Sequence, residues 1–345
     1  MGMTKTELKE NITKIEQILK SENYEAGFEL LKTINNPELT EALAESIQST
    51  VYDKYFFEGK DEGFEILSTL FPNLTSLDLG GCNFEYVPRG IEKIPNLTSL
   101  DLSYCKSLGY DDLEALYYLE NLTNLTSLDL SSCESLQNVY LLSTNLTSLD
   151  LMWCNSLWDV DNLANLTNLT SLNLSYCKSI EDWYCLANLT NLTYLNLCDC
   201  KSLDNVDSLE NLTKLTQLVL SNCKSLFNVD GLGNLTNLSN LMLDGCISLQ
   251  EMDGLANLHN LTSLDLGFCS SLQNVNGLAN CTNLTSLDLG WCESLQNVDG
   301  LANLTNLSSL DLGYCDKVHP KPSKDKMTTR EEVAAYQEEI KKSMK

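Results

Sequence analysis

A unit of 23 residues recurs along most of this chain, and it constrains the fold more than any other feature. One copy, residues 284–306, reads LTSLDLGWCESLQNVDGLANLTN. Eight of the ten intervals between copies are 23 residues long, and the others are 28 and 21. A fixed period of this length is typical of a solenoid, in which each coil contacts only its neighbours. The eleven copies begin at Leu74, Leu97, Leu125, Leu146, Leu169, Leu192, Leu215, Leu238, Leu261, Leu284 and Leu307.

Hydrophobic spacing within the unit predicts the shape of one coil. With the first Leu as position 1, apolar residues occupy positions 1, 4, 6, 9, 12, 15, 18 and 21. The step from 4 to 6 has the period of a strand, and the other steps have period 3, which suits turns and an extended or 3₁₀ return rather than an α-helix. One coil cannot bury enough apolar surface to offset its backbone entropy, so the coils must stack.

The repeat resembles a known family. The pattern LxxLxLxxC, as in residues 284–292, resembles the leucine-rich repeat and covers roughly residues 73–315. The LANLTNLTSLDL run resembles bacterial internalin-like repeats, and LDLxxCxSL resembles repeats of plant intracellular immune receptors. Position 9, usually Asn in the family, is Cys in every copy, as in its cysteine-containing variants. The resemblance implies an α/β solenoid with a curved parallel β-sheet on the concave side, an extended or 3₁₀ convex side, and protein-ligand recognition as the usual activity.

The two ends of the chain differ from the repeats. We expect an N-terminal helical cap over residues 1–72, the solenoid over 73–315, and a polar C-terminal tail over 316–345. Leu8, Ile12, Ile15 and Leu19 follow helical spacing, and further helices are predicted between residues 24 and 70. The 28-residue unit carries an insertion at 111–119 that predicts a convex helix.

The C-terminal tail predicts one short helix. Residues 328–332, TTREE, form a capping box, and Val333, Tyr336 and Ile340 would share one helical face. This helix could fold back as a cap or remain mobile. The tail carries a charge of +2, so it could also contact the acidic repeats.

The charge balance excludes several classes of partner. The chain has 22 Lys and Arg against 48 Asp and Glu, a net charge of -26. Nucleic acids and anionic membranes are bound mainly through Lys and Arg, so neither is expected. No Lys or Arg occurs from Ser225 to Asp316, a stretch with ten acidic residues. We therefore expect a protein or peptide partner, possibly basic, and a monomeric protein.

Cysteines and histidines suggest no catalysis. Eleven of the fourteen cysteines stand at position 9, where neighbouring strands about 4.8 Å apart disfavour disulfides and a straight ladder disfavours metal. We interpret them as buried, reduced thiols that donate to loop carbonyls, with Cys198 as the more exposed exception. The two histidines, His259 and His319, have no nucleophile partner. We predict no catalytic residue, metal or cofactor, and a cytoplasmic location, with secretion without a cleavable signal as the alternative.

The concave face varies where a binding site would be expected. Position 5 is Asp or Asn except at Val219 and Met242, and position 3 is Ser except in the same central region. Position 8 is aromatic on either side of that region. Such a patch inside a charged border resembles the core of a protein interface. The predicted partner-binding residues are Tyr194, Gln217, Val219, Asn240, Met242, Trp153, Tyr176, Phe268, Trp291, Asp265, Asp288 and Asp311.

These patterns predict a non-enzymatic protein-interaction scaffold that binds its partner on the concave face. One alternative is that the repeats have drifted and the aspartates, which repel one another, only keep the sheet soluble. Another is a calcium-binding structural or adhesive protein, because neighbouring carboxylates supply oxygen ligands. A third is a secreted effector or immune-type sensor.

Overall fold

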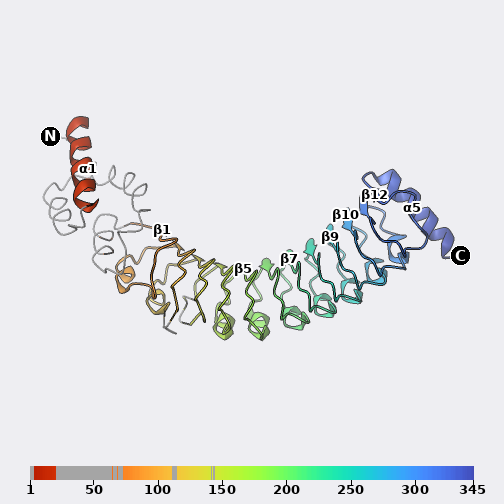
Figure 1. The fold of residues 1–345 in the computed structure, drawn as a ribbon, viewed down its shortest axis with the longest axis horizontal. Helices are drawn as coiled ribbons and strands as arrows, with labels where there is room; N and C mark the ends of the chain where they lie inside the picture. The colour runs from red at the N-terminus through yellow and green to blue at the C-terminus, as the bar shows by residue number, and fades with distance from the viewer. Residues whose placement is uncertain are drawn as a thin grey trace. The chain divides into compact units, whose positions relative to one another are not determined.

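The computed structural model describes residues 4–20, 64, 68, 73–110, 115–140, 142 and 144–345. It divides into two compact units, Met1–Leu146 (unit 1) and Thr147–Lys345 (unit 2) (Figure 1). The domain boundaries expected at 72/73 and 315/316 stay predictions.

Unit 1 contains helix α1 and the first repeats. Helix α1 covers the predicted helical segment and buries Ile15. The other helices predicted before residue 71 lie outside the described residues, except that Phe64 and Ser68 are helical. Strands β1, β2 and β3 pair in parallel with equivalent repeat positions opposite one another. The described elements are α1 (Lys5–Lys20), β1 (Ser76–Asp78), η1 (Arg89–Lys93), β2 (Ser99–Asp101), η2 (Tyr117–Leu119) and β3 (Ser127–Asp129).

The insertion of the 28-residue repeat departs from its prediction where it is described. Residues 111–114 lie outside the described residues, and the rest is a turn followed by the 3₁₀ helix η2 instead of an α-helix. The Leu119 N–H donates to the Leu116 carbonyl at 2.9 Å, and Leu119 and Leu122 are both buried. This spacing of three is the 3₁₀ period, so the return segment keeps the geometry of the shorter repeats.

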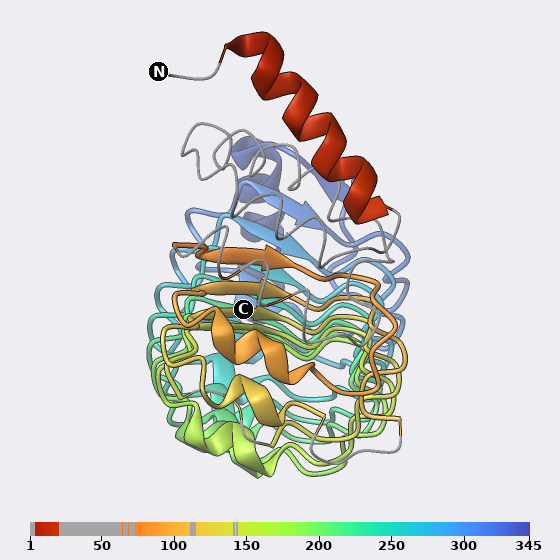
Figure 2. The same ribbon diagram turned by 90° about the vertical axis from the view of Figure 1, so that its left-hand side faces the viewer.

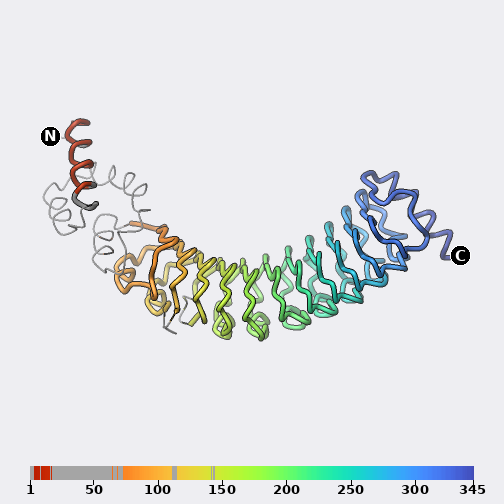
Figure 3. Tube along the Cα trace, viewed as in Figure 1, coloured from red at the N-terminus to blue at the C-terminus, as the bar shows by residue number. Residues whose placement is uncertain are grey.

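Unit 2 repeats a strand and a 3₁₀ helix through seven coils, and strand β11 begins an eighth, shorter one. Its strands line the concave side of the stacked coils, and its 3₁₀ helices line the other side (Figures 1 and 3). Seen from the end, successive coils lie one behind another (Figure 2). The elements are β4 (Ser148–Asp150), η3 (Asp161–Asn165), β5 (Ser171–Asn173), η4 (Tyr184–Asn188), β6 (Tyr194–Asn196), η5 (Asp207–Leu209), β7 (Gln217–Val219), η6 (Asp230–Leu232), β8 (Asn240–Met242), η7 (Asp253–Leu255), β9 (Ser263–Asp265), η8 (Asn276–Leu278), β10 (Ser286–Asp288), η9 (Asp299–Leu301) and β11 (Ser309–Asp311), followed by β12 (Lys326–Met327) and α5 (Arg330–Ser343).

The core follows the predicted apolar positions. In the repeat that begins at Leu215, the side chains of Leu218, Leu220, Cys223 and Leu226 are all buried. Equivalent leucines pair across strands, for example Leu218 with Leu241, because the repeats have equal length. This architecture confirms the predicted solenoid with a parallel sheet and a 3₁₀ return.

The cysteine column is built as predicted. All fourteen cysteines are reduced thiols, and Cys198 alone among them is only partly buried. The Cys223 thiol donates to the Leu197 carbonyl at 3.1 Å, and the Cys246 thiol donates to that of Leu220 at 3.2 Å. Each of these bonds reaches from position 9 to position 6 of the preceding repeat. The column therefore ties neighbouring coils together.

The tail folds back onto the last repeat. Strand β12 pairs antiparallel with β11, and α5 contacts β11, β12 and η9. Helix α5 begins at the predicted capping box, where the Thr329 hydroxyl oxygen accepts from the Glu332 N–H, and it buries Val333, Tyr336 and Ile340. The Gln337 amide donates to two carbonyls of the tenth repeat, those of Leu301 and Leu304, at 2.9 and 3.0 Å. The tail is thus a cap rather than a mobile segment.

Candidate functional site

Strands β6, β7 and β8 bring the central predicted residues together. Tyr194, Gln217 and Asn240 pair in register, and the next row contains Val219 beside Met242. Gln217 is exposed, Met242 is 38% exposed, and the other three are half-buried. These five residues, the central patch, form one continuous surface on three neighbouring strands.

The aspartates around the central patch have a structural task that the sequence analysis did not foresee. Each position-5 aspartate accepts a hydrogen bond from the backbone N–H two residues later. The Asp288 Oδ1 lies 2.8 Å from the Gly290 nitrogen, and the Asp265 Oδ1 lies 2.9 Å from the Gly267 nitrogen. Asn173 makes the same bond at 3.1 Å. This Asx turn ends each strand and offsets the mutual repulsion of the carboxylates.

The central patch departs from this pattern. Val219 and Met242 have no side-chain acceptor, so strands β7 and β8 end without the Asx bond. Instead, the Ser221 hydroxyl donates to the Asp244 carboxylate of the next repeat. The substitutions at these two positions therefore give up a hydrogen bond that the other repeats keep.

Position 8 forms the rim of the sheet and has a left-handed backbone. Large aromatic residues adopt it, with φ of 62° at Trp153, 63° at Phe268 and 64° at Trp291. Only Gly, Asn and Asp adopt this region readily. At the same position, other repeats have Gly81, Asp199, Asn222 and Gly245. Because these residue types favour the left-handed backbone, their presence at position 8 is the sequence signal from which this conformation could have been predicted. The conformation turns the aromatic rings outward along the rim.

The rim aromatics form two separate stacks. Trp153 and Tyr176 stack with ring centres 4.3 Å apart. Phe268, Trp291 and Tyr314 form a second stack, with ring centres 5.7 and 3.8 Å apart. Asp199, Asn222 and Gly245 occupy the rim between them, as the sequence predicted. The predicted aromatic residues thus flank the central patch.

Acidic residues continue the sheet face beyond the central patch. Asp265, Asp288 and Asp311 lie in register on β9, β10 and β11. Burial, followed by the charges of Asp244 and Asp288, raises the pKa of Asp265. The Asp311 Oδ2 accepts from the Lys326 ammonium of β12 at 2.9 Å. This ion pair confirms the expected contact between the positively charged tail and the acidic repeats, although strand β12, which has only two residues and carries Lys326, was not predicted.

Comparison with known families agrees with this geometry. A model described as BspA type Leucine rich repeat region, with six copies, matches residues 108–226 and 196–319. The chain belongs to this leucine-rich repeat family. A second model, Leucine Rich repeat, matches residues 72–87 and 93–116 of this leucine-rich repeat protein. No curated protein matches the chain.

Three solved structures illustrate the likeness. An internalin (inlF) of Listeria monocytogenes is 24% identical, with a TM-score of 0.46, and the match covers 74% of this chain and 87% of that one. Internalin C2 (inlC2) of the same species is 30% identical, with a TM-score of 0.45, over 59% of this chain and 83% of that one. A chain of the mouse RP105/MD-1 complex is 21% identical, with a TM-score of 0.52, over 70% of this chain and 42% of that one. The last of these shows the shared fold.

The candidate metal-binding, thiol and histidine groups of this leucine-rich repeat protein lie in the following surroundings. Among the described residues, no group of three or more His, Cys, Asp or Glu side chains could hold a metal ion. Burial raises the pKa of the Cys246 thiol to about 12, so it stays protonated and unreactive. The Nδ1 of the His259 ring lies 3.1 Å from the Asn280 carbonyl oxygen. In the described part of the chain, no helix is both long and apolar enough to span a membrane.

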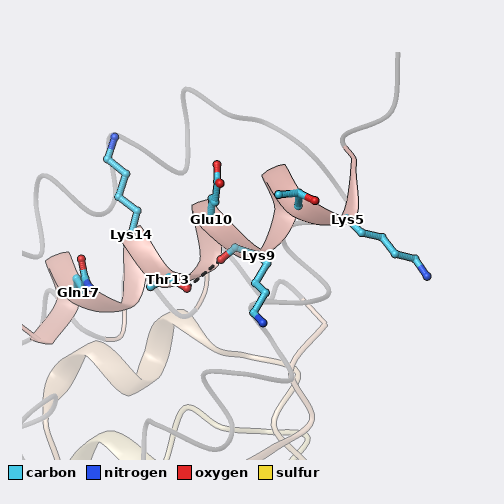
Figure 4. Close-up of a pocket in the computed structure, with 7 residues that line it drawn as sticks. Lys5, Lys9, Glu10, Thr13, Lys14 and Gln17 are labelled. Atoms are coloured by element: carbon cyan, nitrogen blue, oxygen red, sulfur yellow. Dashed lines mark hydrogen bonds between the residues drawn. The ribbon is translucent and has the colours of Figure 1, made fainter.

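A pocket on α1 lies apart from the predicted residues. Its described lining comes from one side of α1 and includes Lys5, Lys9, Glu10 and Lys14 (Figure 4). The Thr13 hydroxyl in it donates to the Lys9 carbonyl at 2.9 Å. None of the predicted partner-binding residues lines this pocket.

Proposed function

We propose that this leucine-rich repeat protein is a non-enzymatic scaffold that binds a protein or peptide on the sheet face of unit 2, centred on the central patch. The observation that carries the proposal is the break in the aspartate ladder at Val219 and Met242. There the Asx bonds are given up, and an uncharged surface is presented between two aromatic stacks. Surfaces with an apolar centre, aromatic flanks and a charged border suit protein recognition.

We also propose that the partner is basic. The stretch from Ser225 to Asp316 contains ten acidic residues and no Lys or Arg. Asp265, Asp288 and Asp311 present part of this charge on the same face as the central patch. A complementary positive segment would be steered to this end of the face, and salt would weaken the association.

The test is capture of partners from the native host with the immobilised protein, followed by mass spectrometry at low and high salt. We expect the double variant Tyr194→Ala, Met242→Ala to lose most of the captured partner, because truncating central interface residues typically costs 2 kcal/mol or more, roughly thirtyfold in affinity. The matched control is Tyr184→Ala, which removes an exposed tyrosine from the 3₁₀ helix η4 on the other side of the coils. Equal capture by the double variant and the wild-type protein would refute the central patch as the binding site.

A further inference from the structure

Lys178 places a positive charge beside the first of the two rim stacks, and the repeats of the second stack have acidic residues at the equivalent sequence position. The Lys178 ammonium lies 5.2 Å from the centre of the Trp153 ring. Lys178 stands at position 10 of the repeat that follows Trp153. The residues at the same place relative to Phe268 and Trp291 are Glu293 and Asp316. The equivalent positions of the two stacks therefore differ in the sign of their charge.

The first stack already has its cation, and the second does not receive one from its own repeats. A cation within about 6 Å of an aromatic ring centre is attracted by the ring face, and Lys178 meets this condition at Trp153. At the second stack, Phe268 is 57%, Trp291 41% and Tyr314 61% exposed. The nearest counterparts of Lys178 are carboxylates, which would repel electron-rich ring faces but attract a cation placed between them and the rings.

The sheet face of repeats nine to eleven, next to the second aromatic stack, is also acidic. In repeats nine to eleven, position 7 is glycine, so no side chain stands between the position-5 aspartate and the position-8 aromatic of each repeat. Asp265 and Asp288 each use Oδ1 for the Asx bond. On Asp311, the Oδ2 binds the Lys326 ammonium at 2.9 Å while the Oδ1 keeps its Asx bond. Lys326 thus shows, within this molecule, that the aspartate ladder accepts a lysine that arrives on an added strand.

Asp316 also takes part in an intramolecular ion pair. Lys321 lies 3.7 Å from Asp316, with both side chains well exposed to solvent. Exposed pairs at this distance contribute little and exchange readily. Glu293 makes no ion pair with any described residue.

We propose that the acidic aromatic rim, defined as Phe268, Trp291, Tyr314, Glu293 and Asp316, binds a Lys or Arg side chain of a basic peptide segment on the partner protein. The inference rests on the proposed function, because it gives the basic partner a specific anchor beside the central patch. The cation of the partner occupies the place that Lys178 takes at Trp153. Its peptide extends along the sheet face toward Asp288 and Asp265.

The test uses a short fluorescein-labelled Gly/Ser peptide that contains three arginines, titrated by fluorescence anisotropy at physiological ionic strength. Wild-type protein should bind this peptide and not its counterpart with three glutamines. Glu293→Lys should weaken binding at least about tenfold, because it supplies an internal ammonium where the peptide cation would lie. Trp291→Leu should weaken binding by a similar factor, whereas Trp153→Leu, in the stack that already has Lys178, should leave it unchanged.

Glu210→Lys is the charge-matched control, because Glu210 is exposed at the end of η5, away from the sheet face. If Glu210→Lys weakens binding as much as Glu293→Lys, the attraction is a general effect of net charge and the proposed anchor is wrong. Equal loss with Trp153→Leu and Trp291→Leu would overturn it as well. Failure of the peptide to bind, with host-partner capture still sensitive to Tyr194→Ala, Met242→Ala, would remove the anchor and leave the proposed function standing.

Discussion

The position-5 aspartates have two opposed effects on stability. Their Oδ1 atoms accept the backbone N–H that ends each strand, as at Asp265 and Asp288. Their charges also lie on neighbouring strands, and burial together with Asp244 and Asp288 raises the pKa of Asp265. Asn173 and Asn196 keep the hydrogen bond without the charge. The hydrogen bond therefore explains why position 5 is Asp or Asn. It does not explain why most repeats have the charged residue, so the charge needs a reason other than the fold.

Asp265→Asn is expected to stabilise the protein at neutral pH by up to about 1 kcal/mol, a value discounted for the half-exposed side chain. Because the folded-state pKa of Asp265 exceeds the unfolded value, the folded protein takes up the proton first as the pH falls. The cost of the buried charge is present above the folded pKa and disappears as the pH falls toward about 4. Urea unfolding midpoints at neutral and acidic pH would measure the gain. A gain that does not change with pH would contradict an electrostatic origin.

Neighbouring coils approach closely at the 3₁₀ helices of the later repeats. Position 17 is Cys185 in η4 and Ser208 in η5, but it is glycine from repeat seven to repeat ten. A Cβ atom added to Gly254 would lie 2.1 Å from the Val229 carbonyl oxygen, and one added to Gly277 would lie 2.0 Å from that of Met252. Glycine is therefore required there by the close approach of neighbouring coils.

Gly254→Ala is expected to destabilise the protein by about 1–3 kcal/mol, because the two coils must separate to admit the methyl group. This loss exceeds the gain of about 0.4–1 kcal/mol that alanine brings by restricting the unfolded chain. Ser208→Ala, at the same position of an earlier repeat, should change stability by less than about 0.5 kcal/mol. The measurement is the free energy of unfolding in urea for both variants. A neutral Gly254→Ala would show that the coils are not in close contact at η7.

The elements were predictable to different extents for physical reasons. The strand and 3₁₀ return followed from spacings of two and three between buried leucines, and the register followed from equal repeat lengths. The central patch could be predicted because a strand fixes which side chains share a face. The left-handed rim was missed because Trp153 and Phe268 do not favour that backbone, which the neighbouring coil imposes on them. Strand β12 was missed because a strand of two residues is too short to show an alternation of apolar and polar residues.

The C-terminal cap determines how the whole molecule ends. Strand β12 pairs with β11, and the Leu312 N–H donates to the Asp325 carbonyl at 2.7 Å, so backbone groups at the last repeat are satisfied. Helix α5 buries Val333 and Ile340, and the Tyr336 hydroxyl donates to the Pro320 carbonyl at 2.7 Å. An uncovered edge strand would be a template for another chain. The cap therefore supports the proposal that the protein is a monomer.

Removal of residues 319–345 is expected to convert the protein into concentration-dependent dimers or larger species, because the edge of β11 and the apolar end of the last repeat are exposed together. A control that lacks only Met344 and Lys345 keeps α5 up to Ser343 and should behave as the full chain does. Light scattering after size exclusion, at several protein concentrations, measures the molar mass directly.

The double variant Val333→Asp, Ile340→Asp keeps the chain length but should release α5, with β12 still able to pair. Its association should therefore be weaker than that of the truncated chain. If the truncated chain keeps the molar mass of a monomer at all concentrations, edge protection by the cap is not what determines the oligomeric state.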